Sequence, residues 1–134
     1  MKSRKFIIPL IVTTALVLGA CGTKEEKKTE QSSTQKTVSI ADGVKEMKQT
    51  LQDLKANLQT KDAEKTKEDG NKLEESWQKF EDGVKEKNAD LYEKVETPLH
   101  TIEAGVKVQP LDVQTLDKAA GELDNVLTEV GKMK

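Results

Sequence analysis

The chain has 134 residues, of which 34% are charged and only 3% aromatic, and its formal net charge is −2. These values exclude a typical nucleic-acid-binding protein, because binding a polyphosphate requires a basic patch and here Lys and Glu alternate along the chain. The single Cys excludes an intramolecular disulfide and a cysteine-based metal site.

Residues 1–20 have the features of a signal peptide. Three basic residues precede the apolar run 6–18, which ends in small residues directly before Cys21. The 13 residues of this run are fewer than the roughly 20 that a membrane-spanning helix needs. Removal of residues 1–20 would leave a mature chain with a formal charge of about −5 and enough length for one small domain.

The tetrapeptide LGAC at residues 18–21 resembles the lipobox of bacterial lipoproteins. This resemblance implies that Cys21 is acylated, for example with palmitate, and becomes the first mature residue. Two acyl chains would hold a small domain stably at a membrane. An ordinary secretory signal followed by a free Cys is the alternative. The expected location is the extracytoplasmic face of the cell membrane, in a bacterium with a single membrane.

Residues 21–37 are predicted to be the lipidated Cys and a flexible tether, because residues 22–37 contain no aliphatic or aromatic side chain to bury. The pattern then becomes helical. Ser39 and Asp42 form a capping-box pattern, and apolar residues recur every three or four positions up to Leu58. A polar break at 60–62 precedes a second helical run over 63–84.

A third helix is predicted to begin after a cap at Asn88 or Asp90, with Pro98 causing a kink or a restart at Thr97. Pro110 suits the opening of a fourth helix, which Gly131 should loosen at its end. Residues 38–134 are therefore predicted to form an all-α, antiparallel up-down four-helix bundle. A coiled coil is the alternative, but each segment is short and polar turns separate the segments.

The third helical segment has a polar stripe that could hold a metal ion. Tyr92, Glu96, His100 and Glu103 are spaced by four, four and three residues, which places them on one side of a helix. Glu96 and His100 would be neighbours, and a carboxylate with an imidazole can ligate a metal. Glu81, from a stripe that also contains Glu74 and Gln78, could approach Tyr92 or Glu96 from the preceding helix.

Simpler interpretations exist for these residues. In a chain so rich in charge, Glu and His are most simply the polar flank of surface helices. Trp77 and Phe80 are most simply the widest layer of the core, although they could stack on a heme or another ligand. No nucleophile stands beside a base, and the one Cys is assigned to lipidation, so we do not expect an enzyme.

The stretch 77–105 resembles the helical extracytoplasmic domain of the oxidase-dependent iron permease family and, more distantly, the imelysin-like lipoproteins of iron uptake. Trp77 and Glu81 are followed by LY at 91–92 and VETPL at 95–99. The resemblance implies that Glu81 and Glu96 contact iron and that Trp77 and Tyr92 line the site. The chain lacks both the glutamate-rich transmembrane motif of the permeases and the GxHxxE motif of the imelysin-like proteins.

The sequence thus favours a lipid-anchored accessory protein of an iron uptake system. Its expected metal ligands are Glu81, Glu96, His100 and Glu103, with iron or another transition metal as cargo and an iron permease as partner. The alternative is a non-metal helical module that docks a membrane or envelope partner through an exposed apolar patch. A monomeric bundle is expected, against the further alternative of a self-associating coiled coil.

Overall fold

A computed structural model describes residues 38–134, and this part of the chain is helical throughout. Its helices are α1 (Ile40–Thr60), α2 (Ala63–Trp77), α3 (Glu81–Lys87), α4 (Ala89–Gly105) and α5 (Val113–Val130). The all-α prediction is confirmed, with five helices where the sequence predicts four. The signal peptide, the lipidation of Cys21 and the tether at 21–37 fall outside the described residues.

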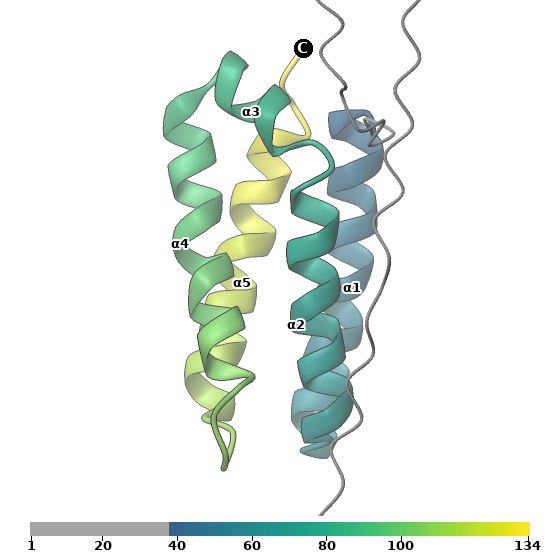
Figure 1. The fold of residues 1–134 in the computed structure, drawn as a ribbon, viewed down its shortest axis with the longest axis vertical. Helices are drawn as coiled ribbons and strands as arrows, with labels where there is room; N and C mark the ends of the chain where they lie inside the picture. Colours follow the sequence, from purple (N-terminus) through teal and green to yellow (C-terminus); the bar gives the residue numbers. More distant parts are fainter. Residues whose placement is uncertain (1–37) are drawn as a thin grey trace, which may run out of the picture. The chain divides into compact units, whose positions relative to one another are not determined.

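The four longer helices lie side by side as a helical bundle (Figure 1). The helix α1 packs against α2 and α5, and α4 packs against the same two helices, while the short α3 packs against α4. Among residues 38–134, none of the helices combines the length and the apolar character needed to span a membrane.

The predicted apolar positions form one continuous core. The buried residues recur at helical spacing on every long helix, as the periodicity predicts. On the two central segments they are Leu73, Trp77, Phe80 and Val84, followed by Leu91, Val95, Leu99, Ile102 and Val106. Gly70 of α2 packs closely against the end of α4, since a Cβ added to Gly70 would lie 2.9 Å from Val106 Cγ2.

Side-chain caps fix where the helices begin. The Asp42 amide donates to Ser39 Oγ at 3.2 Å, and the Leu91 amide donates to Asn88 Oδ1 at 3.0 Å, so both predicted caps are confirmed. Asp62 caps α2 and Asp112 caps α5 in the same way. Backbone hydrogen bonds hold the pKa of both carboxyls below the usual value.

The second helical run is interrupted, contrary to the prediction of one helix over 63–84. The helix α2 ends at Trp77, and the Phe80 amide donates to the Trp77 carbonyl at 3.0 Å, which forms a tight turn. Phe80 is buried, and its ring occupies the space where Gly43 of α1 has no side chain. Packing against α1 therefore overrides the local helical pattern.

The sequence predicts a kink or a restart at Pro98 and a helix that opens at Pro110, and the kink stays a prediction. Pro98 is buried inside an unbroken α4, so the predicted restart at Thr97 is wrong. Thr97 instead donates from Oγ1 to the Glu93 carbonyl at 3.1 Å. Pro110 does not open the last helix, because α5 begins at Val113 under the cap of Asp112.

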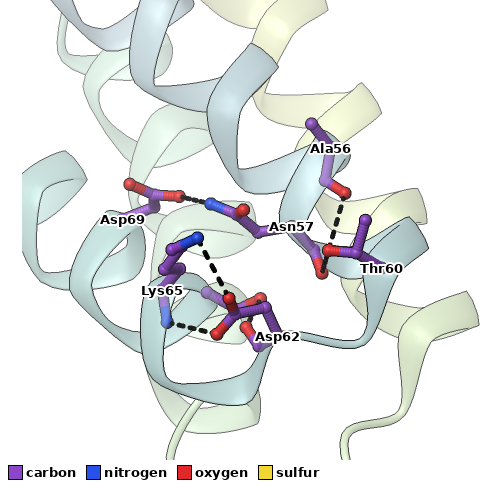
Figure 2. Close-up of polar contacts among 7 residues, drawn as sticks. Ala56, Asn57, Thr60, Asp62, Lys65 and Asp69 are labelled. Atoms are coloured by element: carbon purple, nitrogen blue, oxygen red, sulfur yellow. Dashed lines mark hydrogen bonds and ion pairs between the residues drawn. The ribbon is translucent and has the colours of Figure 1, made fainter.

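A buried polar pair joins α1 and α2 near their connecting turn (Figure 2). Asn57 Nδ2 donates to Asp69 Oδ2 at 2.7 Å, and only 6% of the Asp69 side chain is exposed. Lys72 Nζ lies 3.5 Å from the other carboxylate oxygen. A buried carboxylate needs such partners. Asn57 and Asp69 are 12 residues apart and lie on different helices, so the local sequence pattern does not predict their contact.

Two glycine substitutions should separate close packing from helix propensity. Gly43→Ala should destabilise the protein, because the new Cβ would overlap the Phe80 ring and overpacking of a core costs about 1–3 kcal/mol. Gly121→Ala is the matched control on α5, where no atom lies within 4 Å of the added Cβ, and it should raise the free energy of unfolding by about 0.5–1 kcal/mol. Urea unfolding measures both, and equal gains for the two variants would contradict the packing at Gly43.

Asn57→Ala should also destabilise the protein. It leaves the buried Asp69 carboxylate without its closest donor, and hydrogen bonds to charged groups contribute about 1.5–3 kcal/mol. Asn71→Ala, at an exposed position of α2, makes the same chemical change without breaking a buried contact. A similar free energy of unfolding for the two variants would show that the pair does not stabilise the bundle.

Candidate functional site

Trp77 lies at the end of α2 and is 1% exposed. The Phe80 ring meets it edge-on with centroids 5.1 Å apart, and the Tyr92 ring stacks on it at 5.8 Å with an interplanar angle of 30°. These contacts place Trp77 and Phe80 in the hydrophobic core, as the simpler interpretation predicts.

The indole N–H of Trp77 reaches across to α4. Its Nε1 donates to Glu96 Oε1 at 2.6 Å, and 17% of the Glu96 side chain is exposed. A buried indole needs an acceptor for its only polar atom. The need for that acceptor explains why a glutamate of α4 faces the core edge rather than the solvent.

His100 contacts the second oxygen of the same carboxylate. Its Nε2 lies 3.0 Å from Glu96 Oε2, one helical turn along α4, and 62% of the His100 side chain is exposed. The four-residue spacing predicted this contact. Glu96 thus has one oxygen directed to the buried indole and the other to an exposed imidazole.

Glu81, the first residue of α3, brings a second carboxylate to this region. Burial raises the pKa of Glu81 above its ordinary value of 4.5, and the charges of Glu96, Asp82 and Glu74 raise it further, while Lys85 lowers it. The Glu96 charge is thus one cause of the raised pKa of Glu81, and a direct contact between the two side chains stays a prediction.

Glu74 on α2 contributes a third carboxylate. Gln78 Nε2 donates to Glu74 Oε1 at 2.8 Å. The other oxygen, Oε2, is buried and makes no hydrogen bond within residues 38–134. This oxygen is an acceptor without a donor, which is uncommon for a buried polar atom.

Tyr92 is partly buried and packs against the hydrophobic core. Burial raises the pKa of its phenol above 10, and the charges of Glu96 and Glu81 raise it further. Tyr92 therefore stays protonated at neutral pH and offers a ring and a hydroxyl rather than an anionic ligand. The Lys85 ammonium lies 4.7 Å from the centre of its ring, at a distance suited to a cation–π contact.

The Trp77–Glu96 site, as we name this region, consists of Glu74, Trp77, Glu81, Tyr92, Glu96 and His100. Glu103, the remaining predicted ligand, is half-buried on α4 and makes no side-chain hydrogen bond or ion pair in the described part of the chain. Residues 38–134 contain no group of three or more His, Cys, Asp or Glu side chains arranged to hold a metal ion. The arrangement offers one pair of adjacent ligand atoms, Glu96 Oε2 and His100 Nε2. Glu81 and Glu74 add acidic side chains to the same region.

Two residues, Glu74 of this site and Lys85 beside it, were not proposed as site residues from the sequence. Glu74 appeared only as part of a polar stripe, although its four-residue spacing to Gln78 was visible. Lys85 had a similar signal, because it follows Glu81 by four residues. Neither spacing indicates that the two side chains would meet α4.

Comparisons with family models, with curated proteins and with solved structures give no match. The resemblance of residues 77–105 to iron permease domains therefore gains no support from them. The function has to be argued from the geometry of the Trp77–Glu96 site and from the sequence patterns.

Removing the Glu81 charge should change how stability depends on pH. Below pH 4.5 this carboxyl is protonated in both the folded and the unfolded chain. Above pH 4.5 the unfolded chain ionises first, so the raised folded pKa lowers the free energy of unfolding as pH rises through that pKa. Glu81→Gln should therefore be stabilised relative to wild type at pH 7 but not at pH 4.

Urea unfolding at several pH values between 4 and 7 measures this difference. Glu86→Gln, at an exposed position of the same helix, is the matched control and should differ from wild type by the same amount at every pH. A pH-independent effect of Glu81→Gln would contradict the raised pKa.

Proposed function

We propose that the protein is a lipid-anchored helical lipoprotein of the extracytoplasmic membrane face that captures a metal cation, as an accessory component of an iron uptake system. In this proposal Cys21 carries the lipid, the four long helices form an antiparallel up-down bundle, and the bundle acts as a monomer. The LGAC motif and the resemblance of residues 77–105 support the location and the link to iron.

One geometric observation carries the capture of a cation: Glu96 Oε2 lies 3.0 Å from His100 Nε2, one turn along the same helix. Burial raises the pKa of Glu81, and the charges of Glu96, Asp82 and Glu74 raise it further, so the carboxylates near this pair repel one another. A bound cation would relieve that repulsion. Glu96 and His100 would supply the ligand atoms, and water would complete the coordination.

The position of the site suits delivery to a membrane partner. The Ile40 side chain lies close to Gly83 of α3, and α3 lies at the end of the bundle where α1 begins (Figure 1). The helix α1 therefore begins beside α3, whose first residue, Glu81, belongs to the Trp77–Glu96 site. An iron permease is the proposed recipient of the cation.

The rival proposal, a non-metal docking module, has less support. It requires an apolar patch on the surface, and Val108 is the one exposed large hydrophobic residue within residues 38–134, at 60% exposure. The apolar faces of the helices are buried against one another. This packing also disfavours a coiled coil, because a coiled coil would bury these faces against a second copy of the chain.

Metal titration of the EDTA-treated protein tests the proposal. Ferrous iron, ferric citrate, copper and zinc are added separately, and the heat of binding and the fluorescence of Trp77 are recorded. We expect saturable binding of at least one metal at micromolar concentration. Glu96→Gln and His100→Ala should weaken it at least tenfold without loss of helicity.

Glu129→Gln is the control. Glu129 is exposed on α5, so this substitution removes one negative charge from a helix that carries none of the proposed ligands. The Glu129→Gln variant should bind the metal with the same affinity as the wild-type protein. Absence of saturable binding by any of these metals would refute metal capture and favour the docking module.

A further inference from the structure

A groove lies at the end of the bundle opposite α3, apart from the Trp77–Glu96 site. It is formed by the turn that joins α1 to α2 and by the segment that leads into α5 (Figure 1). Its volume is about 440 Å³, which is in the range of small binding pockets. Its apolar lining residues are Ala63, Pro110, Leu111 and Val113, and its charged lining residues are Lys61 and Asp112. We name it the Lys61–Val113 groove.

The apolar lining of this groove is only partly covered by the rest of the protein. Leu111 and Val113 are half-buried and pack against the core. Pro110 is exposed. Val108, two residues before it, is 60% exposed and is the one exposed large hydrophobic residue in the part of the chain that the structure describes. A surface of this size suits a short segment of chain rather than the broad patch that a large interface needs.

The charges around the groove leave one ammonium group without a partner. Asp112 is occupied by α5, because Oδ1 accepts the Thr115 amide at 3.1 Å and Oδ2 accepts Thr115 Oγ1 at 2.8 Å. Asp62, next to Lys61 in the chain, pairs with Lys65 at 3.3 Å (Figure 2). Lys61 is exposed and makes no ion pair with any residue between 38 and 134. The groove therefore combines apolar walls with one unpaired positive charge.

The backbone at Lys61 also distinguishes this position. Lys61 caps α1 with a φ of 55°, and among the described residues it is the one residue with a positive φ. This left-handed conformation is unfavourable for a residue with a Cβ, and Gly is the usual residue at such a helix end. A Gly would form the same turn at lower cost, so the local fold does not require the lysine side chain.

We propose that the Lys61–Val113 groove binds a short segment of a partner protein that combines apolar and acidic residues. The apolar side chains of the segment cover Leu111 and Val113, and one of its carboxylates pairs with Lys61. Charge complementarity of this kind selects the partner more than it adds affinity. Residues 22–37 of this chain contain no aliphatic or aromatic side chain, so they do not supply the segment. The inference goes beyond the proposed function and does not depend on the capture of a cation.

Synthetic peptides added to the full chain test this proposal. Each peptide alternates two residue types: leucine with glutamate, leucine with glutamine, or serine with glutamate. The methyl resonances of Val108, Leu111 and Val113 are followed by NMR. The leucine–glutamate peptide should shift them saturably, with a Kd at or below about 1 mM, and should bind about two- to fivefold more tightly than the leucine–glutamine peptide. The serine–glutamate peptide should produce no shift.

Two lysine variants isolate the charge. Lys61→Gln should weaken binding of the leucine–glutamate peptide about two- to fivefold. Lys67→Gln, at an exposed position of α2 outside the groove, is the matched control and should bind as tightly as wild type. Lys61→Gly should lose the same affinity while its free energy of unfolding in urea rises, because Gly accepts the positive φ without strain.

Three results would overturn the proposal: no saturable shift with the leucine–glutamate peptide, equal binding of the leucine–glutamine peptide, or full affinity in Lys61→Gln. Shifts of the same methyl groups when the protein alone is concentrated would assign the groove to a second copy of the chain, and would also overturn it. None of these results bears on the metal titration, so a failure of this inference is distinguishable from a failure of the proposed function.

Discussion

The hydrogen-bonding requirement of one buried indole determines the arrangement of the Trp77–Glu96 site. Trp77 is one of the largest fully buried side chains of the core, and its N–H requires an acceptor there. Glu96 provides it at 2.6 Å, which brings a carboxylate to the edge of the core. The second Glu96 oxygen then meets His100, and the Glu96 charge raises the pKa of both Tyr92 and Glu81.

The break between α2 and α3 is the second requirement of this arrangement. It lets Phe80 pack into the space beside Gly43 while Trp77 keeps its contacts with α4. It also makes Glu81 the first residue of a separate helix that packs against α4. The same turn thus closes the core at this end and brings a second carboxylate to Glu96.

Local patterns in the sequence predicted the parts of this structure that depend on neighbouring residues. The apolar spacing identified the core, and the caps at Ser39 and Asn88 and the contact of Glu96 with His100 followed from separations of three or four residues. The break after Trp77 depends instead on Gly43, far away in the sequence. Contacts of that kind follow from the register between helices, which periodicity does not specify.

The hydrogen-bond partners of Glu74 and Glu96 differ from those of other carboxylates on the surface. Glu96 accepts from an indole and lies beside an imidazole, and Glu74 accepts from the amide of Gln78. The indole and the amide are neutral donors that satisfy hydrogen bonds without cancelling charge. The Lys85 ammonium, although it lowers the pKa of Glu81, lies over the Tyr92 ring. Lysine pairs directly with carboxylates at other places on the surface, so these three glutamates differ from those carboxylates in having no ion pair with a lysine within residues 38–134.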